Sequence, residues 1–267
     1  MIIRKTQDEL DAMARAGEVH AKTMKLLAGK VREGVTTGEL DAAAEKYIRS
    51  QGGTPTFKGY QGFPGSTCIS LNSMVVHGIP GKERLQRGDV VSVDIGVTLD
   101  GWVADGAVTF PVGPVTPVAR KLLDVTQQSL FAGLRQCVVG NRMGDVSHAV
   151  QEVVEGAGLG VVRSLVGHGV GRDMHEDPQV PNYGTPGRGP KLTEGMVIAL
   201  EPMVCVGHHE VRMGDDGWAI YSADGSLAAH FEFTIAITAD GPRVLTPWHR
   251  ELGVSLETEP ARPPQAA

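Results

Sequence analysis

The sequence predicts an α+β fold, with helices and mostly antiparallel strands grouped along the chain. Two amphipathic segments near the start are followed by short strand-like runs, and the same order recurs after Pro114. Residues 90–110 contain a strong hairpin signal, and 35 glycines without a repeating period are typical of tight turns between strands. Two helices followed by strands, twice over, indicate a duplicated α+β unit. This duplication rests on element order, because no sequence identity between the halves supports it.

Length and composition limit the class of protein. The 267 residues, 41% of them hydrophobic, suit one large domain or two small ones, and we expect a single domain over residues 1–250 followed by a disordered tail over residues 251–267. The net charge of -6 disfavours nucleic acid as the substrate. Three cysteines without a CxxC spacing predict neither a disulfide framework nor a thiolate zinc site. No apolar run reaches the roughly 18 residues of a membrane span, so we expect a soluble, cytoplasmic protein without a membrane partner.

Two capping boxes mark the first two helices. Thr6 and Glu9 stand at the required spacing before an amphipathic run, and Thr36 and Glu39 open a second helix that ends at a pair of glycines. A strand over residues 68–76 follows this pair of helices.

The hairpin places two carboxylates on one face of a sheet. Apolar residues alternate along residues 90–99, and Asp100-Gly101 is a turn pair that favours hairpins. With this pair in the loop, Gly96 faces Asp105, and Asp105 shares a face with Asp94 one diagonal step away. Two carboxylates this close repel each other unless a cation lies between them or one is protonated. The hairpin therefore predicts a metal site or an acid–base pair, although alone it also fits a surface hairpin with both aspartates in water.

The second half of the chain repeats the order of elements. Amphipathic helices are predicted over residues 119–138 and 145–155. Strands are predicted after them, over residues 161–166, 196–203, 210–213, 219–222 and 229–238.

Two of these late strands carry a carboxylate on a face of small or polar residues. Glu201 lies on one such face, and Glu232 shares another with His230, while the opposite faces are strongly apolar. A glutamate among apolar strand residues has a large desolvation penalty unless it has a partner. A glycine-rich turn over residues 167–176 adds histidines. One imidazole with four carboxylates suits two divalent ions such as Mn, Fe, Co or Zn, and two ions close together can deprotonate a shared water.

Five potential ligands follow one another in the order Asp94, Asp105, His168, Glu201 and Glu232. Together with the flanking runs VDIG, GHGVGRDMHEDP, ALEPM and HFEFT, this set closely resembles the type I methionine aminopeptidases of peptidase family M24. The resemblance covers nearly the whole chain. It implies a pita-bread (creatinase/aminopeptidase) fold, which is a curved, mostly antiparallel sheet with outer helices, a pseudo-twofold duplication and a dimetal site on the concave face.

The resemblance also implies a role for each ligand. Asp94 would bind the first ion, His168 and Glu201 would bind the second, and Asp105 and Glu232 would bridge both. A bridging water or hydroxide would attack the carbonyl group of an N-terminal methionine, and Glu201 would also shuttle the proton.

Residues around the implied metal site complete the expected active site. His77 would lie near the scissile amide and His175 would hydrogen-bond the substrate peptide, so both are expected, with Glu201, to be catalytic. A methionine side chain favours aromatic and sulfur contacts, and the resemblance assigns these to four residues, namely Tyr60, Phe63, Cys68 and Trp218. Three positions depart from the family pattern, which more often has a hydroxyl residue, an aromatic residue and a histidine there: Gly106, Met174 and Phe233.

The implied activity is the removal of the initiator methionine from nascent chains with a small second residue, by a monomer in transient contact with the ribosome. A prolidase or Xaa-Pro aminopeptidase is a first alternative, but those enzymes generally carry an additional domain where this chain has about 60 residues before its first strand. A non-catalytic peptide- or ribosome-binding module is a second alternative, yet all five ligands and both histidines are present. The third is a dimetal phosphoesterase, which the lack of a cationic cluster in the site motifs disfavours.

Overall fold

The two predicted capping boxes form, and each begins a helix. In a computed structural model, which describes residues 1–256, Thr6 caps α1 (Gln7–Ala28) and Thr36 caps α2 (Thr37–Ser50). In both helices the threonine hydroxyl accepts a bond from the N–H three residues on, and the glutamate there accepts one in return. The second pair, α3 (Pro117–Gln136) and α4 (Met143–Gly156), begins within two residues of its predicted starts.

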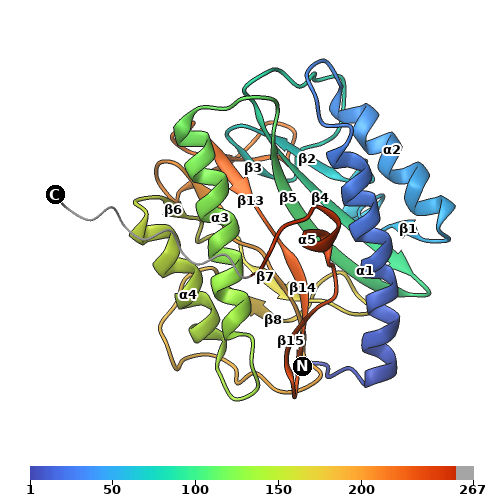
Figure 1. Cartoon of the computed structure of the whole chain (residues 1–267), viewed down its shortest axis with the longest axis vertical. Coiled ribbons are helices and arrows are strands. Elements are labelled where there is room, and N and C mark those ends of the chain that lie inside the picture. The colour runs from blue at the N-terminus through green and yellow to red at the C-terminus, as the bar shows by residue number, and fades with distance from the viewer. Residues whose placement is uncertain (257–267) are drawn as a thin grey trace.

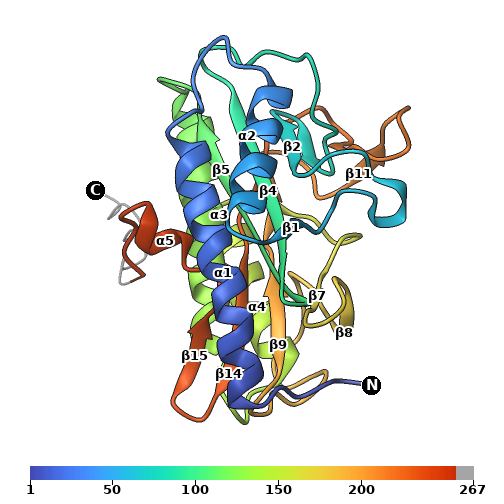
Figure 2. The ribbon, with the colours of Figure 1, turned by 90° about the vertical axis from the view of Figure 1, so that its right-hand side faces the viewer.

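The helices cover one side of the strands. Figure 1 shows α1 and α2 over one half of the molecule and α3 and α4 over the other half, with strands β5 (Trp102–Pro111) and β14 (Phe233–Thr238) between the pairs. Figure 2 shows that the opposite side of the strands carries loops and short strands such as β7 (Gly167–Gly169), β8 (Glu176–Val180) and β11 (Val211–Met213). This arrangement confirms the α+β class and the pita-bread layering of a curved sheet under outer helices.

The central hairpin has the predicted register. Strands β4 (Val90–Leu99) and β5 (Trp102–Pro111) pair so that Gly96 lies opposite Asp105 and Asp94 lies opposite Ala107. Both turn residues have positive φ angles, 51° at Asp100 and 74° at Gly101, as a two-residue hairpin turn of this kind requires. The two aspartates therefore share one face of the sheet.

Three predicted strands are wrong as single elements, because each is interrupted. The strand expected over residues 68–76 divides into β2 (Cys68–Leu71) and β3 (Met74–Val76), since Asn72 turns the chain with a φ of 54°. Those expected over residues 196–203 and 229–238 divide at the predicted glutamate ligands. The resulting strands are β9 (Val197–Leu200), β10 (Met203–Cys205), β13 (Ala228–His230) and β14 (Phe233–Thr238).

The register continues across these interruptions. Leu200 pairs with Phe233 on one side of the break and Met203 pairs with His230 on the other, so Glu201 stands opposite Glu232. Pro202 has no N–H to donate, and its carbonyl accepts a single long bond of 3.3 Å from the N–H of Phe231. The ladder therefore opens at the rung that carries both glutamates.

The two halves of the sheet meet along β5, β13 and β14. The Thr234 hydroxyl accepts a bond from the N–H of Asp105 and donates one to its carbonyl, and the Thr109 hydroxyl makes the same two bonds with His230. Between them, the N–H of Glu232 donates to the carbonyl of Ala107 over 2.9 Å. This seam has local twofold symmetry. A half-turn exchanges Thr109 with Thr234 and His230 with Asp105.

The remaining elements are short. They are β1 (Thr54–Pro55), η1 (Tyr60–Gly62), β6 (Gly160–Val161), β7 (Gly167–Gly169), β8 (Glu176–Val180), β11 (Val211–Met213), β12 (Ile220–Ser222), β15 (Gly241–Val244) and α5 (Trp248–Glu251). The strand expected over residues 161–166 is thus largely wrong, because only β6 touches it. None of the described helices is long and apolar enough to cross a membrane.

The structure describes only the first six residues of the expected tail over residues 251–267. Leu252, Val254 and Leu256 are partly buried and pack against the main apolar core, so residues 251–256 belong with the folded body. The rest of that expected tail, residues 257–267, lies outside the described residues.

Candidate metal centre

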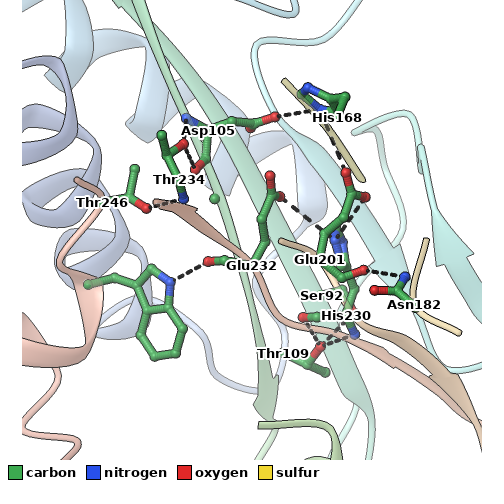
Figure 3. Close-up of polar contacts among 12 residues, drawn as sticks. Ser92, Asp105, Thr109, His168, Asn182, Glu201, His230, Glu232, Thr234 and Thr246 are labelled. Atoms are coloured by element: carbon green, nitrogen blue, oxygen red, sulfur yellow. Dashed lines mark hydrogen bonds and ion pairs between the residues drawn. The ribbon is translucent and has the colours of Figure 1, made fainter. Parts of the chain in front are cut away.

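The five predicted ligands converge where the two halves of the sheet meet. Asp94 and Asp105 come from the hairpin, Glu201 and Glu232 from the open rung, and His168 from β7, which pairs with β9. Within this group, one ligand atom from each of Asp105, His168 and Glu232 lies within 4.8 Å of the others. Figure 3 shows the side chains of Asp105, His168, Glu201 and Glu232 pointing toward one another from separate segments of the chain.

His168 presents a free nitrogen to the carboxylates. Its Nδ1 donates to the carbonyl of Gly169 over 2.8 Å, which leaves the lone pair on Nε2. That Nε2 lies 3.7 Å from Asp105 Oδ2 and 3.6 Å from Glu201 Oε1. Burial lowers the pKa of His168 to about 4, so the imidazole is neutral near pH 7, as a metal ligand must be.

The carboxylates have protonation behaviour that suits a cation between them. Burial raises the pKa of Asp105 to about 7, and burial together with the charges of Asp105 and Glu201 raises the pKa of Asp94 well above its usual range. Burial and the Asp105 charge likewise raise the pKa values of Glu201 and Glu232. Three buried carboxylate oxygens lack a hydrogen-bond partner among the described residues, namely Asp94 Oδ1, Asp105 Oδ1 and Glu232 Oε1. Divalent cations would satisfy these oxygens, so the residues fit a metal centre.

A cavity of about 370 Å³ opens above the carboxylates. His77 and His175 line it, as predicted, and burial lowers the pKa of both histidines. His77 has a φ of 61°, a left-handed conformation that is uncommon outside glycine and is often kept at functional positions. His175 Nδ1 lies 2.7 Å from the Tyr60 hydroxyl, so this tyrosine fixes the imidazole ring.

The apolar wall of the same cavity contains the four residues predicted to contact a methionine side chain: Tyr60, Phe63, Cys68 and Trp218. Phe63 and Trp218 meet edge to face with ring centres 5.1 Å apart. Met174, one of the departures from the family pattern, also lines this wall and is buried. Its flexible thioether therefore occupies the position where relatives more often have an aromatic ring.

At the other two departures from the family pattern, Gly106 and Phe233, the neighbouring space is occupied by His20 and Trp248, which the sequence analysis did not single out. A Cβ at Gly106 would lie 2.8 Å from His20 Cε1, and His20 Nε2 donates to the Gly106 carbonyl over 2.9 Å. Phe233 stacks on Trp248 with ring centres 4.6 Å apart, and Trp248 Nε1 donates to the Glu232 carbonyl over 2.7 Å. Both helical residues, His20 on α1 and Trp248 on α5, thus hold the backbone at or beside a predicted ligand.

Sequence reasoning also missed His230 as a member of the site. It lines the cavity, is 2% exposed, and its Nε2 lies 3.7 Å from Glu201 Oε2 and 3.8 Å from Glu232 Oε2. The signal was its place on the Glu232 face of the strand, two residues earlier.

Comparison with known proteins identifies the family. The model of metallopeptidase family M24 matches residues 11–239, most of the chain. This chain belongs to the metallopeptidase family M24. Its relatives within M24 include the methionine aminopeptidase of Clostridium perfringens, 52% identical over 92% of this chain and 99% of that protein. Methionine aminopeptidase 1 of Bacillus subtilis is 49% identical over the same shares of the two chains.

Solved structures agree with the M24 assignment. The methionine aminopeptidase of Thermotoga maritima superimposes with a TM-score of 0.91 at 43% identity, over 92% of this chain and 99% of that one. The prolidase of Pyrococcus horikoshii gives a TM-score of 0.76 at 24% identity and is covered over only 64% of its length, so it shares the fold alone. The M24 chain is therefore a metal-binding peptide hydrolase of the methionine aminopeptidase type, and the prolidase alternative is disfavoured.

Proposed function

We propose that this M24 hydrolase removes the N-terminal methionine from peptides and nascent proteins with a small second residue. The observation that carries the proposal is a buried centre of one neutral imidazole and four carboxylates at the floor of a cavity with an aromatic and sulfur-lined wall. The names and near full-length identity of its relatives support the same activity.

Each predicted ligand has a place in the proposed centre. Asp94 would hold the first of two divalent ions, His168 and Glu201 would hold the second, and Asp105 and Glu232 would be shared by both. The carboxylate oxygens without partners and the free Nε2 of His168 support these roles. Co, Mn, Fe(II) and Zn all suit such oxygen and nitrogen ligands, and when bound they supply a Lewis acid and an acidified water.

The remaining roles belong to groups of the chain itself. Glu201 accepts the proton of the attacking water and returns it to the leaving amine. His77 and His175 donate hydrogen bonds to the scissile amide, where negative charge develops on oxygen. When the Tyr60 hydroxyl donates to Nδ1 of His175, the Nε2–H of that ring is left as a donor toward the cavity.

The apolar wall selects the methionine side chain. Phe63 and Trp218 offer ring edges and faces to the thioether, while Tyr60 and Cys68 close the slot. Met174 adds a deformable contact, so the slot adapts its shape more than an aromatic residue would allow.

We infer that the enzyme works as a cytoplasmic monomer that meets nascent chains near the ribosome. The three cysteines, Cys68, Cys137 and Cys205, are free and buried, which suits a reducing compartment. The substrate is defined by its free N-terminus, which a nascent chain presents soon after its synthesis begins.

The test is methionine release by metal-stripped protein, with Co, Mn, Fe(II) or Zn added back separately. We expect metal-dependent cleavage of Met-Ala-Ser, much slower cleavage of Met-Leu-Ser, and none of Ala-Pro or Gly-Pro. Cleavage of the proline peptides alone would overturn the proposal in favour of a prolidase. Silence with every metal would instead favour a binding module. The Asp105→Asn variant is the matched control for contaminating peptidases, because it keeps the shape of the side chain and removes its charge.

A further inference from the structure

His230 is a buried histidine whose ring has no hydrogen bond. Neither Nδ1 nor Nε2 has a partner among the described residues, although the side chain is 2% exposed. Buried polar atoms are nearly always bonded, and an unbonded imidazole in a cavity is therefore a sign of a ligand. The proposed roles for the M24 centre do not use this residue.

The seam symmetry relates His230 to Asp105. Thr109 clamps the backbone of His230 through one hydroxyl, as Thr234 clamps the backbone of Asp105. Their partners on the outer strands correspond as well. Asp105 pairs with Gly96 in the hairpin, and His230 pairs with Met203 in the other half of the sheet.

The same symmetry makes Asp94 equivalent to Glu201. Asp94 lies opposite Ala107, Glu201 lies opposite Glu232, and Ala107 and Glu232 face each other at the centre of the seam. His230 thus occupies the position in the second half that a proposed bridging aspartate occupies in the first. Its backbone makes the same two threonine hydrogen bonds as that of the aspartate.

The ring nitrogen is also at a ligand-like distance. His230 Nε2 lies 3.7 Å from Glu201 Oε2 and 3.8 Å from Glu232 Oε2. The corresponding distances from His168 Nε2 to its carboxylate neighbours are 3.6 Å and 3.7 Å. Glu201 therefore lies between two imidazoles, with one oxygen toward each (Figure 3). These separations are too long for hydrogen bonds but leave room for a cation between nitrogen and oxygen.

We propose that His230 is a second imidazole ligand of the metal centre, acting beside Glu201 and Glu232. The inference rests on the proposed function, because it requires that function's metal site. A second nitrogen donor makes the ligand set softer, so the centre should prefer Zn and Co over Mn more strongly than a set with one imidazole.

The direct test counts metal-bound imidazoles in the cobalt-loaded protein. In proton NMR, each coordinated imidazole N–H gives a strongly shifted, exchangeable resonance. We expect two such resonances in the wild type and one in His230→Gln. His249→Gln is the matched control, because His249 is buried and has an unbonded Nδ1 but does not line the cavity. This control should keep both resonances. A single shifted resonance in the wild type would overturn the proposal without any variant having to fold.

Metal competition gives a second readout. The preference for Zn over Mn, measured by titration calorimetry, should fall at least about tenfold in His230→Gln and stay unchanged in His249→Gln. An unchanged preference in His230→Gln would count against the ligand role. If the wild type bound no divalent ion, the proposed function would fail as well. If it bound metal through one imidazole and released methionine, only this inference would fail.

Discussion

Glu201 and Glu232 stand opposite each other in the sheet. The strand pairs on either side, Leu200 with Phe233 and Met203 with His230, fix this register, although both glutamates lie in the gaps between strands. Pro202 and Phe231 occupy the next rung, where proline withholds a donor. Alternation of apolar and polar residues continues through the break, so both carboxylates stay on the cavity face while the ladder opens around them. The sheet thereby brings together two acidic groups that would repel each other without a counter-charge.

The stability of metal-stripped protein should fall as the pH rises from 6.5 to 8. A carboxyl group whose pKa is higher in the folded than in the unfolded state stabilises the fold at a pH below its unfolded-state pKa. This contribution is lost as the pH rises through the folded-state pKa. For Asp105 that loss runs from about 4 to about 7, and it extends higher for the carboxyls with still larger shifts. Buried histidines act oppositely, but their deprotonation in the unfolded state is already half complete at pH 6.5 and nearly complete by about pH 7.5, so the carboxyl groups dominate the change.

Thermal unfolding across that pH range checks this prediction. Added Mn or Co should reverse the loss, with a metal-induced rise in Tm that grows with pH because binding displaces protons. Asp105→Asn should flatten the pH dependence, stabilise stripped protein at pH 8 by about 2 kcal/mol, and weaken metal binding at least about a hundredfold. A Tm that rises with pH in stripped wild type would contradict the assignment.

His77→Gly should lower kcat about a hundredfold while metal content stays the same. Glycine adopts the φ of 61° found at this position and has no side-chain donor, so the substitution removes the donor without new backbone strain. The size follows from other enzymes that lose one donor to a developing oxyanion. The measurements are methionine release and metal analysis of the same preparation. Loss of metal in the variant would make His77 a ligand, and an unchanged kcat would remove it from the catalytic groups.

The sequence predicts the local parts of this site better than its long-range parts. Thr6 and Thr36 cap their helices, and the Asp100-Gly101 turn sets the hairpin register, because each depends on neighbours within a few residues. The break at Glu201 was not predicted, since apolar alternation runs through it. The clamp of Thr109 on His230 joins residues 121 positions apart, and nothing in either local pattern indicates the other.

Gly106→Ala should destabilise the protein by about 1–3 kcal/mol, because the new methyl group would overlap the ring of His20, 2.8 Å away. In a His20→Ala background the same change should cost less than about 1 kcal/mol, since only the Glu232 carbonyl oxygen, 3.3 Å from the added Cβ, then remains close to it. Chemical denaturation of the four proteins of this cycle measures the coupling. Additive effects would show that His20 does not account for the glycine at this position.

Trp248→Phe should weaken metal binding while it keeps most of the packing of the apolar core. Trp248 Nε1 donates to the Glu232 carbonyl over 2.7 Å, and its ring stacks on Phe233. Phenylalanine keeps most of the stacking but leaves a buried carbonyl without its donor, which should cost about 1–3 kcal/mol of stability. Because this bond fixes the backbone of a proposed bridging ligand, metal affinity should also fall about tenfold or more.

Trp102→Phe is the control for that substitution. Trp102 is also buried and packs under the guanidinium of Arg172, 3.8 Å from its ring centre, away from the Glu232 backbone. It should lose some stability through the weakened cation–π contact and keep its metal affinity. Calorimetric metal titration of both variants separates the two effects. Equal affinities in Trp248→Phe and wild type would mean that the Glu232 backbone is held by the seam with β5 alone, through its bond to Ala107.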